Sequence, residues 1–379
     1  MQNTQNFPPG LSIGIDGNEA NTKIRVGVGQ YAYNLLVELH RQNVNNKFWI
    51  YLKEKPLGDL PPENKNWHYM VFGPKKLWTK IALPLHLFLF SKKIDLFYSP
   101  SHYSPLFSPV PTIPTVHDIG YLKYQDQFTK KDLYQLINWT KSSIDKAHHI
   151  VAVSQFTKNE LINTYQIPPG KISIVYNGVG TPKQISQKEK NQILKKFNIK
   201  SPYFLAVGTL KPNKNYPFLI DTFSKFLKKR GDSFQLVIAG KKGWLFDEID
   251  TAIKQLNLTN QVIFTDYISE KEKWALYQNA ISLVIPSTYE GFGIPAIESQ
   301  KVATPVIASD IPSLKEVLGD SAIYIDPEDS SSLLLAFEKI LNSKYKESIV
   351  KNSLKQANKF TWENSAKNLI NLFHQKFIH

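Results

Sequence analysis

The 379-residue sequence contains no cysteine, no long hydrophobic run and no leader-like start. The absence of cysteine excludes disulfide bonds and thiolate zinc sites, and it fits a reducing compartment. The most apolar stretch, IALPLHLFLF, has ten residues, whereas a membrane-spanning helix needs about 20. The opening MQNTQNFPPG has neither the basic nor the apolar region of a signal peptide. We therefore expect a soluble, cytoplasmic protein.

Acidic residues are fewer than basic ones: the sequence has 46 lysines and arginines but 32 aspartates and glutamates, which gives a net charge of +14. This balance favours an anionic partner, which nucleic acid, a membrane surface or phosphorylated small molecules could each provide. The basic residues are dispersed along the chain, and no recognised DNA- or RNA-binding motif occurs. We expect no nucleic-acid partner, and a basic nucleic-acid-binding protein is the weakest alternative.

Twelve short apolar runs, among them LSIGID, KFWIYL, YFLAVGTL and ISLVIPS, alternate with stretches of helical length. Such alternation indicates parallel sheets covered by helices on both faces. Twelve strands exceed one typical sheet, so the sequence predicts an α/β fold with two doubly wound domains. The polar stretch 177–200 is the best candidate for a linker. We place one domain at 1–180, a second at 181–360 and a final helix at 361–379.

Ligands of open α/β sheets bind beyond the carboxyl ends of the strands, so the residues that follow each run are candidates for function. Gly27 and Gly29 precede the helical YAYNLLVELH, where glycines let backbone N–H groups approach an anion. A tight turn would need the same residues. His117 ends a run in TVHD. It can bind a ligand hydroxyl or shuttle a proton, or it is a buried histidine satisfied by backbone.

In the second half, Gly208 and Thr209 end YFLAVGTL, and Lys211 and Lys214 follow in the loop. Asn215 is a candidate cap for the next helix. A lysine at a helix N-terminus opposes the helix dipole, which favours anions. A phosphate between the lysine and the helix would explain this arrangement, and a solvated loop is the alternative.

The stretch YEGFGIPAIE places Glu290 and Glu298 on either side of Gly291 and Gly293, after the apolar ISLVIPS. Backbone N–H groups at such a turn can hold a diphosphate. The flanking carboxylates can accept hydrogen bonds from hydroxyls, which a sugar nucleotide has on both sides of its diphosphate. We expect Glu298 in about the first helical turn. A pure capping role for Glu298 would leave Glu290 and both glycines unexplained.

With this stretch, the sequence resembles the retaining glycosyltransferases of family 4, which have the GT-B fold. The resemblance spans nearly the whole chain and is most specific in PSTYEGFGIPAIES and TPVIASDIPSLKEVLGDSAIYIDPED. The segments GVGQYAYNLL, TVHD, AVSQFTKNEL, ISIVYNGV, VGTLKPNKN and FTWENSA occur in the family's order. The resemblance implies two Rossmann-like domains facing a cleft. The N-terminal domain would bind the acceptor and the C-terminal domain the donor, and the last helix would cross back to the N-terminal domain.

The resemblance also implies roles for single residues. Glu290 would contact hydroxyls of the transferred sugar, Lys214 a phosphate, and His117 the sugar near its reacting carbon, so these three are the expected catalytic residues. Glu298 would contact the ribose. The further donor-binding positions are Gly29, Gly208, Thr209, Lys211, Gly291, Phe292, Gly293 and Ile294.

Three positions depart from the family pattern. Thr209 and Asn213 stand where many members have an arginine, and Lys211 is the candidate to replace that charge. Ala303 stands where a glycine is usual. The sequence contains no Asp-x-Asp pair, which would be the obvious metal ligand on a diphosphate. We expect no metal and no cofactor, with Lys214 and helix ends stabilising the leaving diphosphate.

The expected function is transfer of a sugar from a nucleotide donor to a hydroxyl of a glycan or lipid-linked acceptor, by front-face attack with retention. GDP-mannose is preferred over a UDP-sugar, because the motifs resemble those of bacterial mannosyltransferases of polysaccharide assembly. The alternatives are a GT-B sugar-nucleotide epimerase or phosphorylase, and an NAD-dependent oxidoreductase. The incomplete glycine fingerprint argues against the oxidoreductase.

The segment 75–93, KKLWTKIALPLHLFLFSKK, carries five lysines and no acid around an apolar stretch. A basic amphipathic surface of this kind can dock on anionic lipid, which would place the protein peripherally at the inner face of the membrane. The alternative is a core helix with solvated lysine ends.

Overall fold

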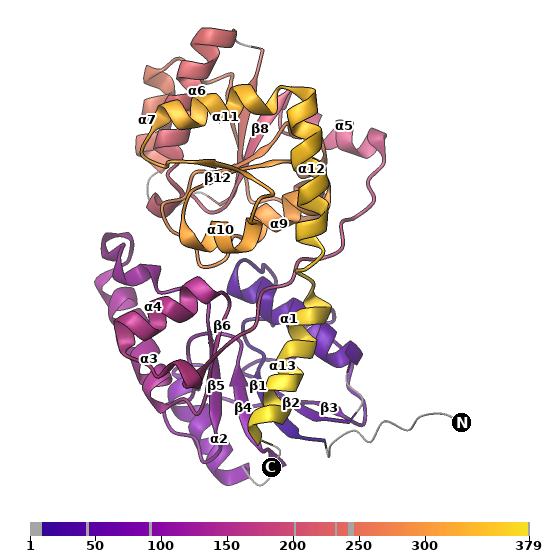
Figure 1. Ribbon diagram of the computed structural model, residues 1–379. Coiled ribbons are helices and arrows are strands. Elements are labelled where there is room, and N and C mark those ends of the chain that lie inside the picture. The colour runs from indigo at the N-terminus through magenta and orange to yellow at the C-terminus, as the bar shows by residue number, and fades with distance from the viewer. Residues whose placement is uncertain are drawn as a thin grey trace. The chain divides into compact units, whose positions relative to one another are not determined.

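The computed structural model describes residues 10–42, 45–90, 93–200, 202–231, 233–241 and 246–377. The chain divides into two compact units, each an α/β structure (Figure 1). Unit 1 comprises Met1–Lys123, Phe128–Gly178 and Thr361–His379, and unit 2 comprises Tyr124–Gln127 and Val179–Phe360.

Unit 1 is built on a seven-stranded sheet of order β3-β2-β1-β4-β5-β6-β7. All its pairings are parallel. The strands are β1 (Ser12–Asp16), β2 (Lys47–Leu52), β3 (Trp67–Val71), β4 (Leu96–Ser99), β5 (Thr112–Val116), β6 (Ile150–Ala152) and β7 (Ile172–Ile174).

Helices cover this sheet, and they are α1 (Val28–Gln42), α2 (Leu83–Phe90), α3 (Lys130–Lys146), α4 (Gln155–Tyr165) and α13 (Trp362–Phe377). A short π-helix, η1 (Trp78–Ala82), leads directly into α2. The C-terminal α13 packs against α1 and shares a hydrophobic core with β1, β2 and β4. Unit 1 is therefore completed by residues from the far end of the chain.

Unit 2 is built on a six-stranded parallel sheet of order β10-β9-β8-β11-β12-β13. Its strands are β8 (Tyr203–Val207), β9 (Gln235–Ala239), β10 (Val262–Asp266), β11 (Leu283–Ile285), β12 (Val306–Ser309) and β13 (Ile323–Ile325). Its helices are α5 (Gln187–Lys196), α6 (Tyr216–Arg230), α7 (Phe246–Gln255), α8 (Glu270–Asn279), α9 (Ile294–Lys301), α10 (Pro312–Leu318), α11 (Ser330–Ile340) and α12 (Ser343–Ala357).

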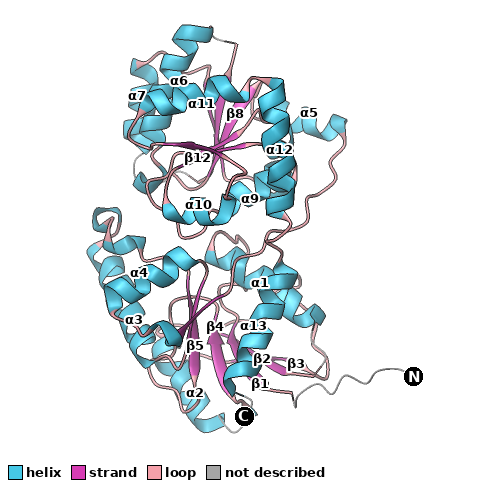
Figure 2. Ribbon diagram, viewed as in Figure 1, coloured by secondary structure: helices cyan, strands magenta, loops and turns pink. Residues whose placement is uncertain are grey.

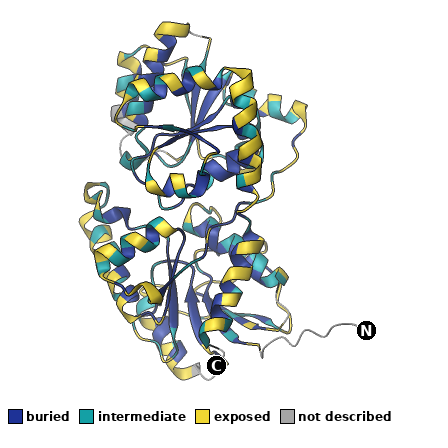
Figure 3. Ribbon diagram, viewed as in Figure 1, coloured by how far each residue is buried: buried dark blue, intermediate teal, exposed yellow. Residues whose placement is uncertain are grey.

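In unit 2, α6, α7 and α11 pack together on one face of the sheet. On the other face, α9 packs against β11 and β12, with α10 and α12 beside it (Figure 2), and α8 also contacts α9. Most strand residues are buried, while the helices keep an exposed outer side (Figure 3). Burial on both faces explains why the strands read as continuous apolar runs. The predicted fold of two doubly wound parallel sheets is confirmed.

Part of the predicted linker is helical. Residues 187–196 form α5, which begins with a capping box. Ser186 Oγ accepts from the backbone N–H of Glu189 at 3.3 Å, and Glu189 Oε2 accepts from the backbone N–H of Ser186 at 2.9 Å. The S-x-x-E signature in SQKE is the local signal for this helix start. The linker prediction is therefore wrong for these residues.

Ala303 occupies the position that ends α9, where the backbone turns left-handed with φ of 61°. Its N–H donates to Gln300 O at 3.1 Å and the N–H of Thr304 donates to Ser299 O at 3.1 Å, which is a Schellman motif. Left-handed backbone costs a residue with a Cβ about 1–2 kcal/mol, and glycine avoids most of that. We expect Ala303→Gly to raise the free energy of unfolding by up to about 1 kcal/mol in urea titrations. A loss of stability would contradict this account.

Among the described helices, none combines the length and the apolar character that crossing a membrane requires.

Candidate functional site

The predicted donor residues of unit 2 lie at the point where the order of the strands in its sheet reverses. β8 and β11 are neighbours in the sheet although two strands separate them in sequence. The loops that follow them are 208–215 and 286–293, and both leave the carboxyl edge of the sheet. This edge is the topological switch point, where open α/β sheets bind ligands.

An ion pair joins the two loops. Lys214 Nζ lies 2.6 Å from Glu290 Oε1, and both side chains are mostly buried, with 19% and 13% exposed. Ser287 Oγ donates to the same Oε1 atom at 2.7 Å. Within the described residues, Glu290 Oε2 accepts no hydrogen bond. A lysine ammonium has three donors and a carboxylate about four acceptor sites, so both groups keep capacity for a ligand.

Asn213 ties the same loops together through its side chain and its backbone. Its Nδ2 donates to Tyr289 O at 3.1 Å, and its carbonyl accepts from the N–H of Thr288 at 2.9 Å. The residue that departs from the family pattern therefore braces the loop that carries Lys214. Asn215 begins α6 at its N-cap position but makes no capping bond; its side chain donates to Pro327 O at 2.9 Å instead.

Two glycines have conformations that this site requires. Gly208 has φ of 154°, and a Cβ there would lie 3.3 Å from Lys214 Cε, so its bare backbone leaves room for the lysine. Gly293 has φ of 88°, and a Cβ there would lie 2.5 Å from Leu314 Cδ2. Gly293 is the N-cap of α9, with Pro295 in its first turn. Pro295 has no N–H, and the N–H of Ala296 donates to Gly293 O at 3.0 Å, which leaves the N–H of Ile294 at the start of the helix to favour an anion.

Glu298 is not in the first turn of α9, because the helix begins at Ile294. Glu298 is the fifth residue of the helix, close to the predicted place, and it does not cap the helix. It is 8% exposed and binds two side chains of α8. Lys273 Nζ lies 2.6 Å from its Oε1, and Tyr277 OH donates to its Oε2 at 3.0 Å. Burial lowers the pKa of Lys273, but Glu298 and Glu270 raise it by more, so the net shift is upward.

Lys273→Met should destabilise unit 2, because it leaves Glu298 as a mostly buried carboxylate without its cation. Breaking one partner of a buried pair typically costs about 3–5 kcal/mol. We expect a loss near the lower end of this range in chemical denaturation, and recovery of most of it in Lys273→Met/Glu298→Gln. Lys271→Met is the matched control, because Lys271 pairs with Glu189 on the surface, where such pairs contribute little. Equal effects of the two lysine variants would contradict this role.

The other predicted donor residues of unit 2 lie in the same two loops. Thr209 is half-buried directly after Gly208, and Lys211 is exposed at the start of the short 3₁₀ helix Pro212–Lys214. Gly291 lies between Glu290 and Phe292, and Ile294 opens α9. The ring of Phe292 is buried, with its centroid 5.4 Å from that of Phe360. Phe292 therefore offers backbone rather than its ring to a ligand.

His117 and Gly29 belong to unit 1. His117 follows β5, and its Nε2 lies 2.9 Å from Pro100 O; since a carbonyl only accepts, Nε2 carries the proton. Burial lowers the pKa of His117, so the neutral ring offers Nδ1 as an acceptor. The ring of Tyr31 in α1 meets that of His117 edge-on at 4.7 Å. Gly29 lies in the first turn of α1, where its N–H donates to Val26 O at 3.0 Å.

Sequence reasoning missed Lys273 and Tyr277 as partners of Glu298. Both lie on α8 four residues apart, so they share one helix face, but nothing in KWALY alone points to a distant acid. Within the described residues, no group of three or more His, Cys, Asp or Glu side chains could hold a metal ion. The expectation of metal-independent chemistry stays a prediction.

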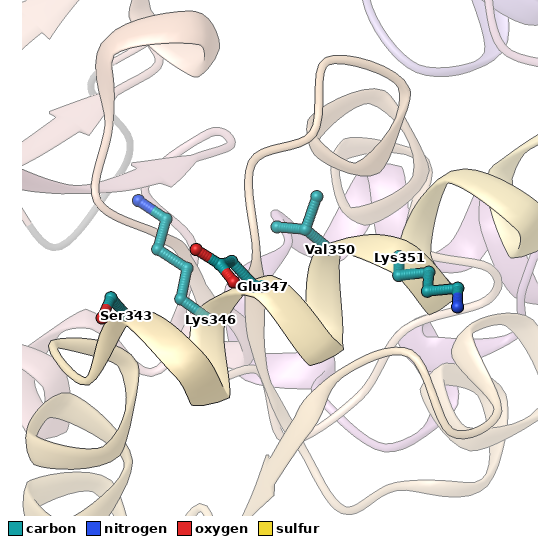
Figure 4. A pocket seen from close by; sticks show the side chains of 5 residues that line it. All are labelled: Ser343, Lys346, Glu347, Val350 and Lys351. Atoms are coloured by element: carbon teal, nitrogen blue, oxygen red, sulfur yellow. The ribbon is translucent and has the colours of Figure 1, made fainter.

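A separate hollow lies on unit 2 beside α12. Its lining residues all belong to that one helix, and they are Ser343, Lys346, Glu347, Val350 and Lys351 (Figure 4). None of them is a predicted site residue, and the hollow plays no part in the arrangement above.

Several known proteins are similar to this chain. The O-antigen chain mannosyltransferase RfbU of Salmonella typhimurium is 37% identical over 226 residues, which are 60% of this chain and 60% of that protein's length. The O-antigen chain mannosyltransferase B of Escherichia coli is 26% identical over 266 residues, 69% of each chain. HepE of Anabaena, solved in complex with UDP and glucose, has a TM-score of 0.74 at 16% identity and covers 96% of this chain and 100% of its own.

Two family models match the chain. The model of the Glycosyltransferase Family 4 matches residues 26–182. The model of the glycosyl transferases group 1 matches residues 170–375, more than half of the chain, including both loops of the Lys214–Glu290 pair. The fold is that of the GT-B glycosyltransferases, and the chain belongs to the family of glycosyl transferases group 1.

Proposed function

We propose that this chain is a retaining glycosyltransferase that transfers mannose from GDP-mannose to a hydroxyl of a glycan or lipid-linked acceptor, without a metal ion. Similarity to two O-antigen chain mannosyltransferases supports mannose as the transferred sugar. The observation that carries the proposal is the Lys214–Glu290 pair at the switch point of unit 2, beside the N-terminus of α9.

In this proposal, the diphosphate of the donor binds Lys214 and the N–H of Ile294 at the start of α9. The free Oε2 of Glu290 accepts from a hydroxyl of the sugar, and Glu298 accepts from the ribose hydroxyls with its remaining lone pairs. Negative charge grows on the diphosphate as the bond from the anomeric carbon to oxygen breaks. A fixed cation and helix dipole stabilise that charge without reorganising during the reaction.

Retention follows from attack on the face that the leaving group vacates. The acceptor oxygen bonds to the anomeric carbon, and its proton passes to the departing phosphate oxygen, so no side chain has to form a covalent bond to the sugar. For neutral His117 we propose the role of a hydrogen-bond acceptor for a substrate hydroxyl. Trapping of a glycosyl adduct on any side chain would exclude this route.

The direct test is a thermal-shift screen against sugar nucleotides in buffer containing EDTA, followed by turnover assays with the best donor. GDP-mannose should raise the melting temperature most and should turn over in the presence of EDTA. UDP-sugars are the second candidate donors, because HepE was solved with UDP and glucose. An isomerised sugar nucleotide formed without any acceptor would instead identify an epimerase, and a requirement for a divalent ion would overturn the metal-independent part.

We further propose that unit 1 docks on anionic lipid through the α2 apolar surface, which consists of Leu77, Ile81, Leu85, Phe88 and Leu89. These side chains are 46–76% exposed and recur at helical spacing along η1 and α2. The opposite side of the same segment is core, where Trp78, Ala82, Leu83 and Leu87 are buried.

Positive charge next to the α2 apolar surface supports an anionic membrane as its partner. Lys75, Lys76, Lys80 and Lys93 flank the surface, while Ser91 and Lys92 lie outside the described residues. Basic side chains near a membrane add about 1 kcal/mol each. The interpretation as a core helix with solvated ends explains only the buried side of this segment.

Vesicle sedimentation tests this docking. The parent protein should bind vesicles that contain phosphatidylglycerol, more weakly at high salt, and should bind pure phosphatidylcholine poorly. Phe88→Ser/Leu89→Ser should lower the bound fraction several-fold. Leu335→Ser is the matched control, since Leu335 is a 59% exposed leucine of unit 2. Equal binding of neutral and anionic vesicles, or an equal loss in the control, would end the proposal.

A further inference from the structure

Unit 1 contains a pocket of about 220 Å³ that the donor chemistry does not use. Asp16 at the end of β1, Lys53 after β2 and Ser101 after β4 line it. β1 and β4 are neighbours in the sheet, and the strand order changes direction between them. The pocket therefore lies at the topological switch point of unit 1, where ligands bind.

Asp16 is the polar anchor of this pocket. It is 8% exposed, and burial raises its pKa to about 6. Its Oδ1 accepts two hydrogen bonds from Asn18, from the backbone N–H at 3.0 Å and from Nδ2 at 2.7 Å. Among the residues the structure describes, none donates to Oδ2. Asp16 lines the pocket, and a carboxylate has about four acceptor sites, so Oδ2 keeps capacity to accept from a ligand hydroxyl.

Aromatic side chains form another wall. The rings of Tyr103 and Trp139 meet edge-on at 5.7 Å, and Lys80 Nζ lies 3.6 Å from the centroid of the Trp139 ring. Pyranose rings pack their C–H faces on aromatic rings while their hydroxyls bind carboxylates and amides. The volume is below the range of about 300–1,000 Å³ for drug-sized ligands, so a single sugar ring is the suitable occupant.

The pocket is continuous with the α2 apolar surface. Leu77 lines the pocket and also begins that surface, and Trp78 and Lys80 of η1 line the pocket as well. Lys53, Lys75 and Lys80 line the pocket as well, so its lining has three basic side chains beside the two acids Asp16 and Glu19. A ligand that combines a sugar, an anionic group and an apolar chain within a short distance matches these three features together.

We propose that this pocket binds the acceptor sugar of a short lipid-linked saccharide whose sugar is joined to its lipid through phosphate. The proposal rests on the glycosyltransferase function above and deepens it. Because pocket and apolar surface share Leu77, the sugar that receives the new residue lies close to the lipid. The reaction that supplies this substrate must then be a transfer of sugar phosphate, or of a first sugar, to a lipid phosphate.

Binding without donor tests the pocket independently of turnover. The probes are mannose, galactose and N-acetylglucosamine, each as the free sugar and as the farnesyl diphosphate conjugate, titrated while tryptophan fluorescence is recorded. At least one conjugate should bind about tenfold or more tightly than its free sugar. Asp16→Asn and Trp139→Ala should each weaken binding about tenfold. Tyr134→Ala, an exposed aromatic of the same α3 helix, should leave binding unchanged.

Turnover with these conjugates separates the two proposals. Asp16→Asn and Trp139→Ala should raise KM for the acceptor and leave slow hydrolysis of the donor in water unchanged, and a longer glycan chain on the conjugate should lower kcat/KM. Unchanged binding in both variants would overturn the pocket assignment, and equal rates on free and lipid-linked glycans would overturn the lipid-linked substrate. If the parent protein does not hydrolyse the donor at all, the proposed function itself is contradicted.

Discussion

Glu290→Ala is expected to lower turnover by at least about 100-fold, the effect of removing one group that stabilises a transition state. Glu290 holds Lys214 at 2.6 Å and presents the only free carboxylate oxygen that we assign to the transferred sugar. Its loss removes both functions at once. The measurement is the initial rate of nucleoside diphosphate release at saturating donor, with circular dichroism to show that the variant is folded.

The matched control is the pair of Asp221 and Lys225 on α6, whose charged atoms lie 2.8 Å apart with about half of each side chain exposed. Asp221→Ala removes the same kind of partner from a lysine in the same unit, and it should leave turnover within about twofold because exposed pairs contribute little. A Glu290→Ala variant that keeps a tenth or more of the parent rate would contradict the role assigned to this carboxylate.

Lys214→Met is expected to weaken binding of the diphosphate. The turnover rate should fall by a larger factor than the affinity for GDP. A hydrogen bond to a charged group typically contributes about 1.5–3 kcal/mol, so GDP should bind about 10- to 100-fold more weakly. Guanosine, which lacks the phosphates, should bind equally to parent and variant. Turnover should fall by about 100-fold or more, since the charge on the leaving group is largest in the transition state.

Lys211→Met tests the second lysine of the same loop, which is exposed and is also a predicted donor-binding residue. The sequence assigns it a compensating charge for the arginine that relatives carry. If Lys211 does supply that charge, its variant will lose part of the affinity for GDP. If parent, Lys211→Met and Lys214→Met all bind GDP equally, the phosphate lies elsewhere and the assignment of this loop is wrong.

The alternation of apolar runs with helical stretches predicted both sheets correctly, because strands buried on both faces need continuous apolar sequence. It missed β3, WHYMV, which lies at the sheet edge and is only partly buried. An edge strand pairs on one side only, so a half-buried His68 and an exposed Val71 are tolerated there. The structure gives this segment its strand identity through pairing with β2.

The sequence predicted the single residues of the candidate site, but it did not predict which of them contact each other. Motif order pointed to Lys214 and Glu290 separately, but their contact joins residues 76 apart in sequence, and only the adjacency of β8 and β11 brings them together. Likewise, the sequence left the segment 75–93 open between a lipid-docking surface and a core helix with solvated lysine ends. No local pattern showed that Phe88 and Leu89 would lie outside the core, because which side of a helix is covered depends on its neighbours.

The ion pair between the loops of unit 2 also affects how the products leave. While a sugar nucleotide is bound, Lys214 binds the phosphates and Glu290 accepts a hydrogen bond from the sugar. After transfer, the remaining nucleoside diphosphate has lost the hydroxyls that occupied the acid, which then competes with the phosphates for the same cation. Because the carboxylate already lies 2.6 Å from the lysine, this competition would lower the affinity for the nucleoside diphosphate product and for inorganic phosphate.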